Sequence, residues 1–102
     1  MGSPGRKAAA AALPHLAGTA GGFDFVIANC ENAAAGKGIT KKIAEELFSI
    51  GIDGMTSGNH IWDKNEGVAV LQEEKRIVRP ANYPDDCPGQ GLMILEKNGM
   101  RL

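Results

Sequence analysis

The stretch FDFVIANCENAAAGKGITKKIAEELFSIGIDGMTS, residues 23–57, decides the fold class of this chain. Residues 23–28 are mostly apolar and rich in β-formers, which predicts a short buried strand. Thr40 can cap a following helix, and Gly51 can end it. Residues 52–57 give a weaker strand signal, but they stand where a parallel partner follows a crossover helix. The stretch therefore predicts an α/β fold with mostly parallel strands.

The residues before this stretch predict an alanine-rich helix and a loop. Ser3 is the expected cap and Pro4 the first helical residue, since the amide that proline lacks would be unpaired there. Pro14 is expected to kink or end the helix because it removes a backbone donor. The following loop is marked by Gly18, Gly21 and Gly22.

The residues after residue 57 predict a second helix. Asp63 and Glu66 have the spacing of a capping box, for a helix that runs to about Lys75. Its inner face is expected to carry Val68 and Leu71.

The last part of the chain predicts little regular structure apart from a hairpin. Residues 77–78 are a short strand candidate. Residues 92–102 predict the start of a β-hairpin, because Asn98 and Gly99 suit the positive φ angles of a type I′ turn. The second strand of this hairpin would have only three residues, which gives little cross-strand pairing. We therefore expect residues 1–102 to be part of a larger domain.

Composition places the chain among ordinary globular domains. It has 102 residues, of which 43% are hydrophobic and 23% charged, unlike a disordered chain. A formal net charge of -1 gives no general attraction to nucleic acids or membranes. No run is long and apolar enough to span a membrane, and no secretory h-region opens the sequence. We expect a cytoplasmic protein with no membrane partner, whose cysteines, Cys30 and Cys87, are reduced.

Two polar clusters follow the two predicted strands. Asn29-Cys30-Glu31-Asn32 comes after the first, and Gly58-Asn59-His60 after the second. Because the carboxyl ends of parallel strands meet at one edge of a sheet, these clusters are expected to share a crevice. Glutamate can bridge two divalent cations, asparagine offers a neutral oxygen, and histidine binds metal or donates a proton. Since Asn, Gly and His are also common turn residues, spacing alone leaves plain turns as the alternative.

Several strings in order resemble the N-terminal part of the YmdB-like metallophosphoesterases, which belong to the calcineurin-like superfamily. The resemblance runs from GSPGR near the N-terminus to the end of the chain, and its other strings are NCENAA (29–34) with GKG (36–38), GNHIWDK (58–64) and RPANYP (79–84).

This resemblance implies a four-layer α/β/β/α sandwich with two divalent metal ions, iron or manganese. It implies hydrolysis of phosphodiesters such as 2′,3′-cyclic nucleotides. By the same resemblance, Glu31 is the carboxylate that bridges both metals, Asn32 binds one metal and Asn59 binds the other. His60 is then the proton donor to the leaving oxygen.

The chain also departs from the family pattern. That pattern has an Asp in a Gly-Asp pair at the end of a first strand, just before the GSPGR string, and three histidine ligands in its C-terminal half. This sequence begins at Met1-Gly2, and its only histidine besides His60 is His15, which we expect to be a surface or packing residue. We therefore expect the first strand and the C-terminal half to be missing, and the fragment to be inactive or weak alone.

Four other residues admit a structural and a functional interpretation. Cys30 stands where the family usually has a small residue, and a buried inert thiol is favoured over a metal ligand. Lys37 does not belong to a P-loop, because glycine follows it, and a solvated basic face is favoured over a phosphate contact. Trp62 is expected to pack on the following helix, with stacking on a base as the alternative. Arg79 contacts either a phosphate or nearby carbonyls.

Two further hypotheses stay open beside the enzyme. The same crevice can serve a non-catalytic module that recognises a phosphate or an RNA end. The chain can also assemble with another subunit, as a homo-oligomer or with a chain that supplies the absent half, because an exposed sheet edge invites pairing.

Overall fold

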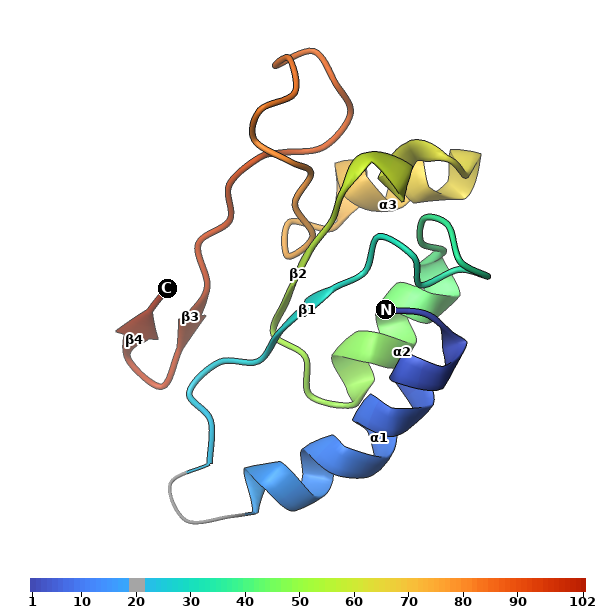
Figure 1. Ribbon diagram of the computed structural model, residues 1–102. Helices are drawn as coiled ribbons and strands as arrows, with labels where there is room; N and C mark the ends of the chain where they lie inside the picture. The colour runs from blue at the N-terminus through green and yellow to red at the C-terminus, as the bar shows by residue number, and fades with distance from the viewer. Residues whose placement is uncertain (19–21) are drawn as a thin grey trace.

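The computed structural model describes residues 1–18 and 22–102, so the predicted loop residue Gly21 lies outside the described residues. The chain is mixed α/β, with the helices on one side of the β1–β2 pair in Figure 1 and a hairpin on the other. The elements in order are α1 (Ser3–Ala17), β1 (Ile27–Asn29), α2 (Lys41–Ser49), β2 (Gly54–Thr56), the 3-10 helix η1 (Asn59–Trp62), α3 (Asn65–Glu73), β3 (Glu96–Lys97) and β4 (Met100–Arg101).

The parallel pairing of β1 and β2 confirms the predicted strand, helix, strand unit. Ile27 is in register with Gly54, and the two strands stay paired to their ends. The first strand is shorter than predicted, because residues 23–26 lie outside the ladder, and it is not buried as predicted, since Ile27 is 40% exposed. Val26 is held instead by Asp53, whose carboxylate accepts from the Val26 amide at 2.8 Å. The strand predicted at residues 77–78 is reduced to a single parallel bridge between Met55 and Ile77.

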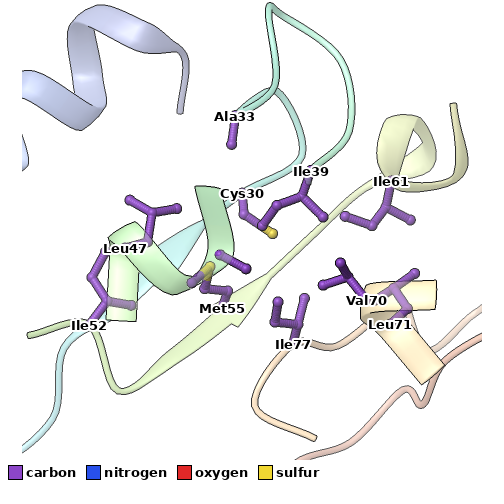
Figure 2. Close-up of a cluster of buried hydrophobic side chains, with 11 residues drawn as sticks. Cys30, Ala33, Ile39, Leu47, Ile52, Met55, Ile61, Val70, Leu71 and Ile77 are labelled. Carbon is purple, nitrogen blue, oxygen red and sulfur yellow. The ribbon is translucent and has the colours of Figure 1, made fainter. Parts of the chain in front are cut away.

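The core lies between β2 and the two helices α2 and α3. Met55 is fully buried near the middle of this cluster (Figure 2). The α2 helix begins as predicted, since the Thr40 hydroxyl accepts from the Ile43 amide at 3.3 Å. The buried members of the cluster are Cys30, Ala33, Ile39, Ala44, Leu47, Ile52, Met55, Ile61, Val70, Leu71 and Ile77.

The predictions for α1 were partly wrong. Its N-cap is Gly2, and Ser3 is already helical and makes no side-chain cap. Pro14 lies inside the helix, which continues to Ala17. The last turn stays helical, since the Pro14 carbonyl accepts a hydrogen bond from the Gly18 amide at 3.3 Å.

The capping box predicted for α3 is absent. Its N-cap is Lys64, which makes no side-chain cap. Asp63 binds the His60 ring, and Glu66 accepts from the backbone amide of Lys41 at 3.0 Å, so both acids are engaged elsewhere. The helix ends at Glu73, and it buries Gly67, Val70 and Leu71, while Val68 is only half-buried.

The hairpin is confirmed. Asn98 and Gly99 have φ angles of 51° and 77°, as a type I′ turn requires. Beyond β3 and β4, Leu95 and Leu102 exchange two backbone hydrogen bonds of 2.9 Å. Among the helices of the described residues, none has both the length and the apolar run needed to cross a bilayer.

Candidate metal and phosphoester site

The loops that follow β1 and β2 meet at Glu31 and Gly58. A Cβ placed on Gly58 would stand 2.3 Å from Oε2 and 2.5 Å from Oε1 of Glu31. The carboxylate therefore rests directly on the backbone of residue 58, next in the chain to Asn59. The two polar clusters converge here because their strands are parallel and end at the same edge.

The Glu31 backbone is fixed by its neighbours. Its amide donates to Oδ1 of Asn29 at 3.1 Å, and its carbonyl accepts from the Gly38 amide at 2.6 Å. Gly38 has a φ of +66°, and a Cβ there would lie 3.1 Å from the carbonyl oxygen of His60. The loop that carries Glu31 thus packs against η1, which carries His60.

The first residues of the chain hold the same loop from the other side. The Met1 ammonium donates to the carbonyl of Asn29 at 3.1 Å, and Nη1 of Arg6 donates to the carbonyl of Ala33. Sequence reasoning missed these two contacts. The GSPGR string was the available signal, because it places a cation one turn into α1.

Of the two predicted asparagine ligands, Asn32 follows Glu31 in the chain and Asn59 follows Gly58. Asn32 is half-buried directly after Glu31, and Asn59 is exposed as the first residue of η1. Within the described ranges, neither amide side chain makes a hydrogen bond, and the Glu31 carboxylate makes no hydrogen bond or ion pair. No described residue is therefore bound to these oxygens in competition with a cation.

His60 is oriented by Asp63. Its Nδ1 lies 2.8 Å from Oδ2 of Asp63, the residue that follows η1, and the two side chains are 40% and 34% exposed. Ile61 between them is fully buried and anchors the turn. The nitrogen that Asp63 does not engage is Nε2, which leaves that atom available to a ligand.

Cys30 behaves as the inert thiol that the sequence favours. It is fully buried in the core, and burial raises its pKa to about 12. At neutral pH the thiolate that binds metals is therefore disfavoured.

Arg79 and Trp62 both have structural contacts. Arg79 is 6% exposed and donates to the carbonyls of Pro80 and Tyr83 at 3.1 and 3.4 Å. Trp62 is partly buried against the core cluster, which includes Val70 and Leu71 of the following helix. Its ring meets Tyr83 edge-on at 4.7 Å, and Nε1 donates to the carbonyl of Pro88 at 3.2 Å, so the 80–88 loop provides its polar and aromatic contacts.

The donor set fits part of a metal centre. One carboxylate and two amide oxygens are hard ligands of the kind that Mn²⁺ and Fe²⁺ accept. In the part of the chain that the structure describes, no group of three or more His, Cys, Asp and Glu side chains is placed to hold a metal ion. Glu31 and Asn59 come from loops that meet at Gly58, and Asn32 is next to Glu31 in the chain.

A comparison with known families shows which family the chain belongs to. A family model described as YmdB-like protein matches residues 1–102. The chain belongs to this family. It is 43% identical over 102 residues to the 2′,3′-cyclic-nucleotide 2′-phosphodiesterase of Bacillus subtilis. The match covers all of this chain and 38% of that protein. It is 36% identical over 83 residues to a putative phosphatase/phosphodiesterase of Mycoplasma pneumoniae, covering 78% of the chain and 30% of the relative.

Two crystal structures have the same fold over nearly the whole chain. A hypothetical protein from Thermus thermophilus matches with a TM-score of 0.87 and 42% identity, over 99% of this chain and 38% of that one. A novel phosphatase from Mycoplasma pneumoniae matches with a TM-score of 0.83 and 33% identity, over 97% and 36%. The chain therefore spans less than two-fifths of each of these proteins.

Proposed function

We propose that this chain carries part of the active site of a metal-dependent phosphodiesterase whose substrates include 2′,3′-cyclic nucleotides. The observation that carries the proposal is the Glu31 carboxylate resting on Gly58, beside Asn59 and His60 and without a protein partner among the described residues. Homology to a cyclic-nucleotide phosphodiesterase supports the substrate class.

In this proposal the residues have separate roles. Glu31 bridges two divalent ions, Asn32 binds one of them, and Asn59 binds the other. Such ions, iron or manganese, supply charge neutralisation of the phosphoryl group and activation of water. His60 holds a proton at Nε2 and gives it to the leaving oxygen of the substrate.

Three side chains are too few ligands for two metal ions, each of which prefers four to six. We therefore propose that residues 1–102 are one part of a metallophosphoesterase domain with a four-layer α/β/β/α fold. The coverage of about 38% of the Bacillus subtilis relative supports this assignment. Hydrolysis by these residues alone is expected to be weak or absent.

A non-catalytic phosphate or RNA-binding module is the second candidate. It is favoured by the lack, among the described residues, of a group of three or more His, Cys, Asp and Glu side chains that could hold a metal ion. In that case nucleotide binding would depend on the polar loops and not on a metal.

Calorimetric titration separates the two functions. A cyclic nucleotide is titrated into the chain with Mn²⁺ and then with a chelator. The phosphodiesterase proposal predicts that binding requires Mn²⁺ and weakens by at least about tenfold in Glu31→Gln, since a metal ligand is lost. Glu45→Gln, an exposed change on α2, is the matched control and leaves binding unchanged. Binding that survives the chelator, without turnover, overturns the proposal and supports the module.

A further inference from the structure

The short helix η1 presents three different faces. In a 3-10 helix, side chains three residues apart lie one above the other, about 6 Å along the axis. Asn59 and Trp62 therefore share one face of η1. His60 and Asp63 share a second face, and Ile61 on the third is fully buried. The tryptophan thus stands one helical turn from a proposed metal ligand.

Tyr83 extends the face of η1 that carries Asn59. Its ring centroid lies 4.7 Å from that of Trp62, and the two planes meet at 68°. Such an edge-to-face contact covers at most one face of the tyrosine ring. Tyr83 is half-buried, and its hydroxyl makes no hydrogen bond with any described residue. Part of the ring and the hydroxyl are therefore open to a ligand.

The loop that carries Tyr83 is fixed by Arg79. This arginine is 6% exposed, and its Nη1 donates to the Tyr83 carbonyl at 3.4 Å. Its backbone amide donates to the Gln90 carbonyl at 2.9 Å and so closes the loop, which is drawn in orange in Figure 1. Nε1 of Trp62 is bound to the same loop, through the Pro88 carbonyl. Because both rings are held in advance, a ligand that contacts them loses little affinity to ordering them.

We propose that Tyr83, held against Trp62, is the residue on which the base of a nucleotide substrate stacks. This inference rests on the proposed function, in which Asn59 binds a metal ion beside the phosphoryl group. A sugar separates the base of a nucleotide from its phosphate, and one turn of η1 separates Asn59 from Trp62. Aromatic rings stack on any base, and the free hydroxyl can exchange a hydrogen bond with the base or the sugar. The site is then expected to prefer nucleotides over phosphodiesters that carry no base.

The preference is measured with two compounds that differ only in the base. One is adenosine 2′,3′-cyclic phosphate, and the other is the same sugar cyclic phosphate with a methoxy group in place of adenine. Each is titrated into the chain with Mn²⁺, and calorimetry gives the affinity. We expect the nucleotide to bind at least about fivefold more tightly, the effect of one stacked base.

Fluorescence gives a second readout. Trp62 is the only tryptophan of the chain and Tyr83 its only tyrosine, so the emission of Trp62 reports on this one contact. The nucleotide should change that emission, whereas the compound without a base should not.

The deciding variant is Tyr83→Ala. It should weaken binding of the nucleotide at least about fivefold and leave binding of the base-free compound unchanged. Tyr83→Phe keeps the ring and should retain most of the preference. Asn82→Ala, an exposed change in the same loop, is the matched control and should alter neither affinity.

Two results overturn the inference. One is equal affinity of the wild-type chain for the two compounds, a comparison that needs no variant. The other is an equal loss of both affinities in Tyr83→Ala while circular dichroism shows that this variant is folded.

The inference and the proposed function fail separately. Nucleotide binding that survives a chelator overturns the proposed function, whatever the base contributes. Binding of both compounds that requires Mn²⁺ but shows no preference overturns only the stacking role of Tyr83.

Discussion

The carboxylate of Glu31 fills the space that a side chain at position 58 would occupy. A Cβ on Gly58 would be 2.4 Å from the carboxyl carbon of Glu31, well inside van der Waals contact. Gly58 has a φ of -139°, which other residues adopt freely, so the constraint on this position is space and not backbone strain. The absence of a side chain at 58 is what lets the Glu31 carboxylate lie against the loop after β2.

Gly58→Ala should therefore displace the Glu31 carboxylate from the loop at residue 58. The Glu31 side chain must swing away, but it is flexible, so the free energy of unfolding should fall by no more than about 1 kcal/mol. Mn²⁺ affinity should fall by about tenfold, because the carboxylate leaves Asn59. Calorimetry and thermal unfolding measure the two effects. In the control Gly2→Ala, a Cβ meets nothing closer than 3.9 Å, so the Mn²⁺ affinity should stay unchanged. If Gly58→Ala bound Mn²⁺ with the same affinity as the wild-type chain, this account of the site would be contradicted.

Asp53 should contribute more to stability than its exposed ion pair suggests. Its carboxylate accepts from Nζ of Lys97 at 3.0 Å and from the Val26 amide at 2.8 Å. Asp53→Ala leaves that amide unpaired and should cost about 1–3 kcal/mol in urea unfolding. Lys97→Met removes only the ion pair and should cost about 0.2–1 kcal/mol. Equal losses in the two variants would show that the Val26 contact contributes nothing.

The pair of Glu74 and Arg76 should make a small part of the free energy of unfolding sensitive to acid. Side-chain hydrogen bonds from Arg76 hold the pKa of Glu74 below its ordinary value of 4.5. Because the folded pKa is the lower one, the stabilisation is complete above pH 4.5 and is lost as pH falls through the folded value. Since the pair is partly exposed, the effect is under about 1 kcal/mol. Glu74→Gln should flatten this part of the pH–stability curve, whereas Glu73→Gln should not; identical curves for both variants refute the assignment.

The two cysteines should differ in reactivity. Cys30 is fully buried with a raised pKa, while Cys87 is half-buried in a loop. Iodoacetamide at neutral pH should modify Cys87 and leave Cys30 intact in the folded chain, since the thiolate is the reactive form. Mass spectrometry of digested protein gives the result for each site, with urea-unfolded protein as the control. Equal modification before unfolding would mean that Cys30 is not in the core.

The sequence predicted the features that depend on local chemistry. The Thr40 cap, the parallel strands on either side of α2 and the Asn98-Gly99 turn follow from short patterns, and the structure confirms them. The meeting of Glu31 with the loop at residue 58 was also predictable, because parallel strands bring their carboxyl ends together.

Features that depend on a partner distant in sequence were not predictable. Val26 lies outside the ladder because its amide donates a hydrogen bond to the Asp53 carboxylate. Arg6 reaches the Ala33 carbonyl across the fold. Asp63 is the local exception, since a capping box and a contact with His60 compete for one carboxylate, and spacing does not decide between them.

The central claim is that Glu31 and the loop at residues 58–60 form one side of a metal site. Paramagnetic broadening of amide NMR signals by Mn²⁺ tests it most directly, because the effect is confined to residues near the ion. We predict selective broadening at residues 29–32 and 58–60, lost in Glu31→Gln and kept in Glu45→Gln. Broadening that is absent from these two loops, or unchanged in Glu31→Gln, would contradict the claim.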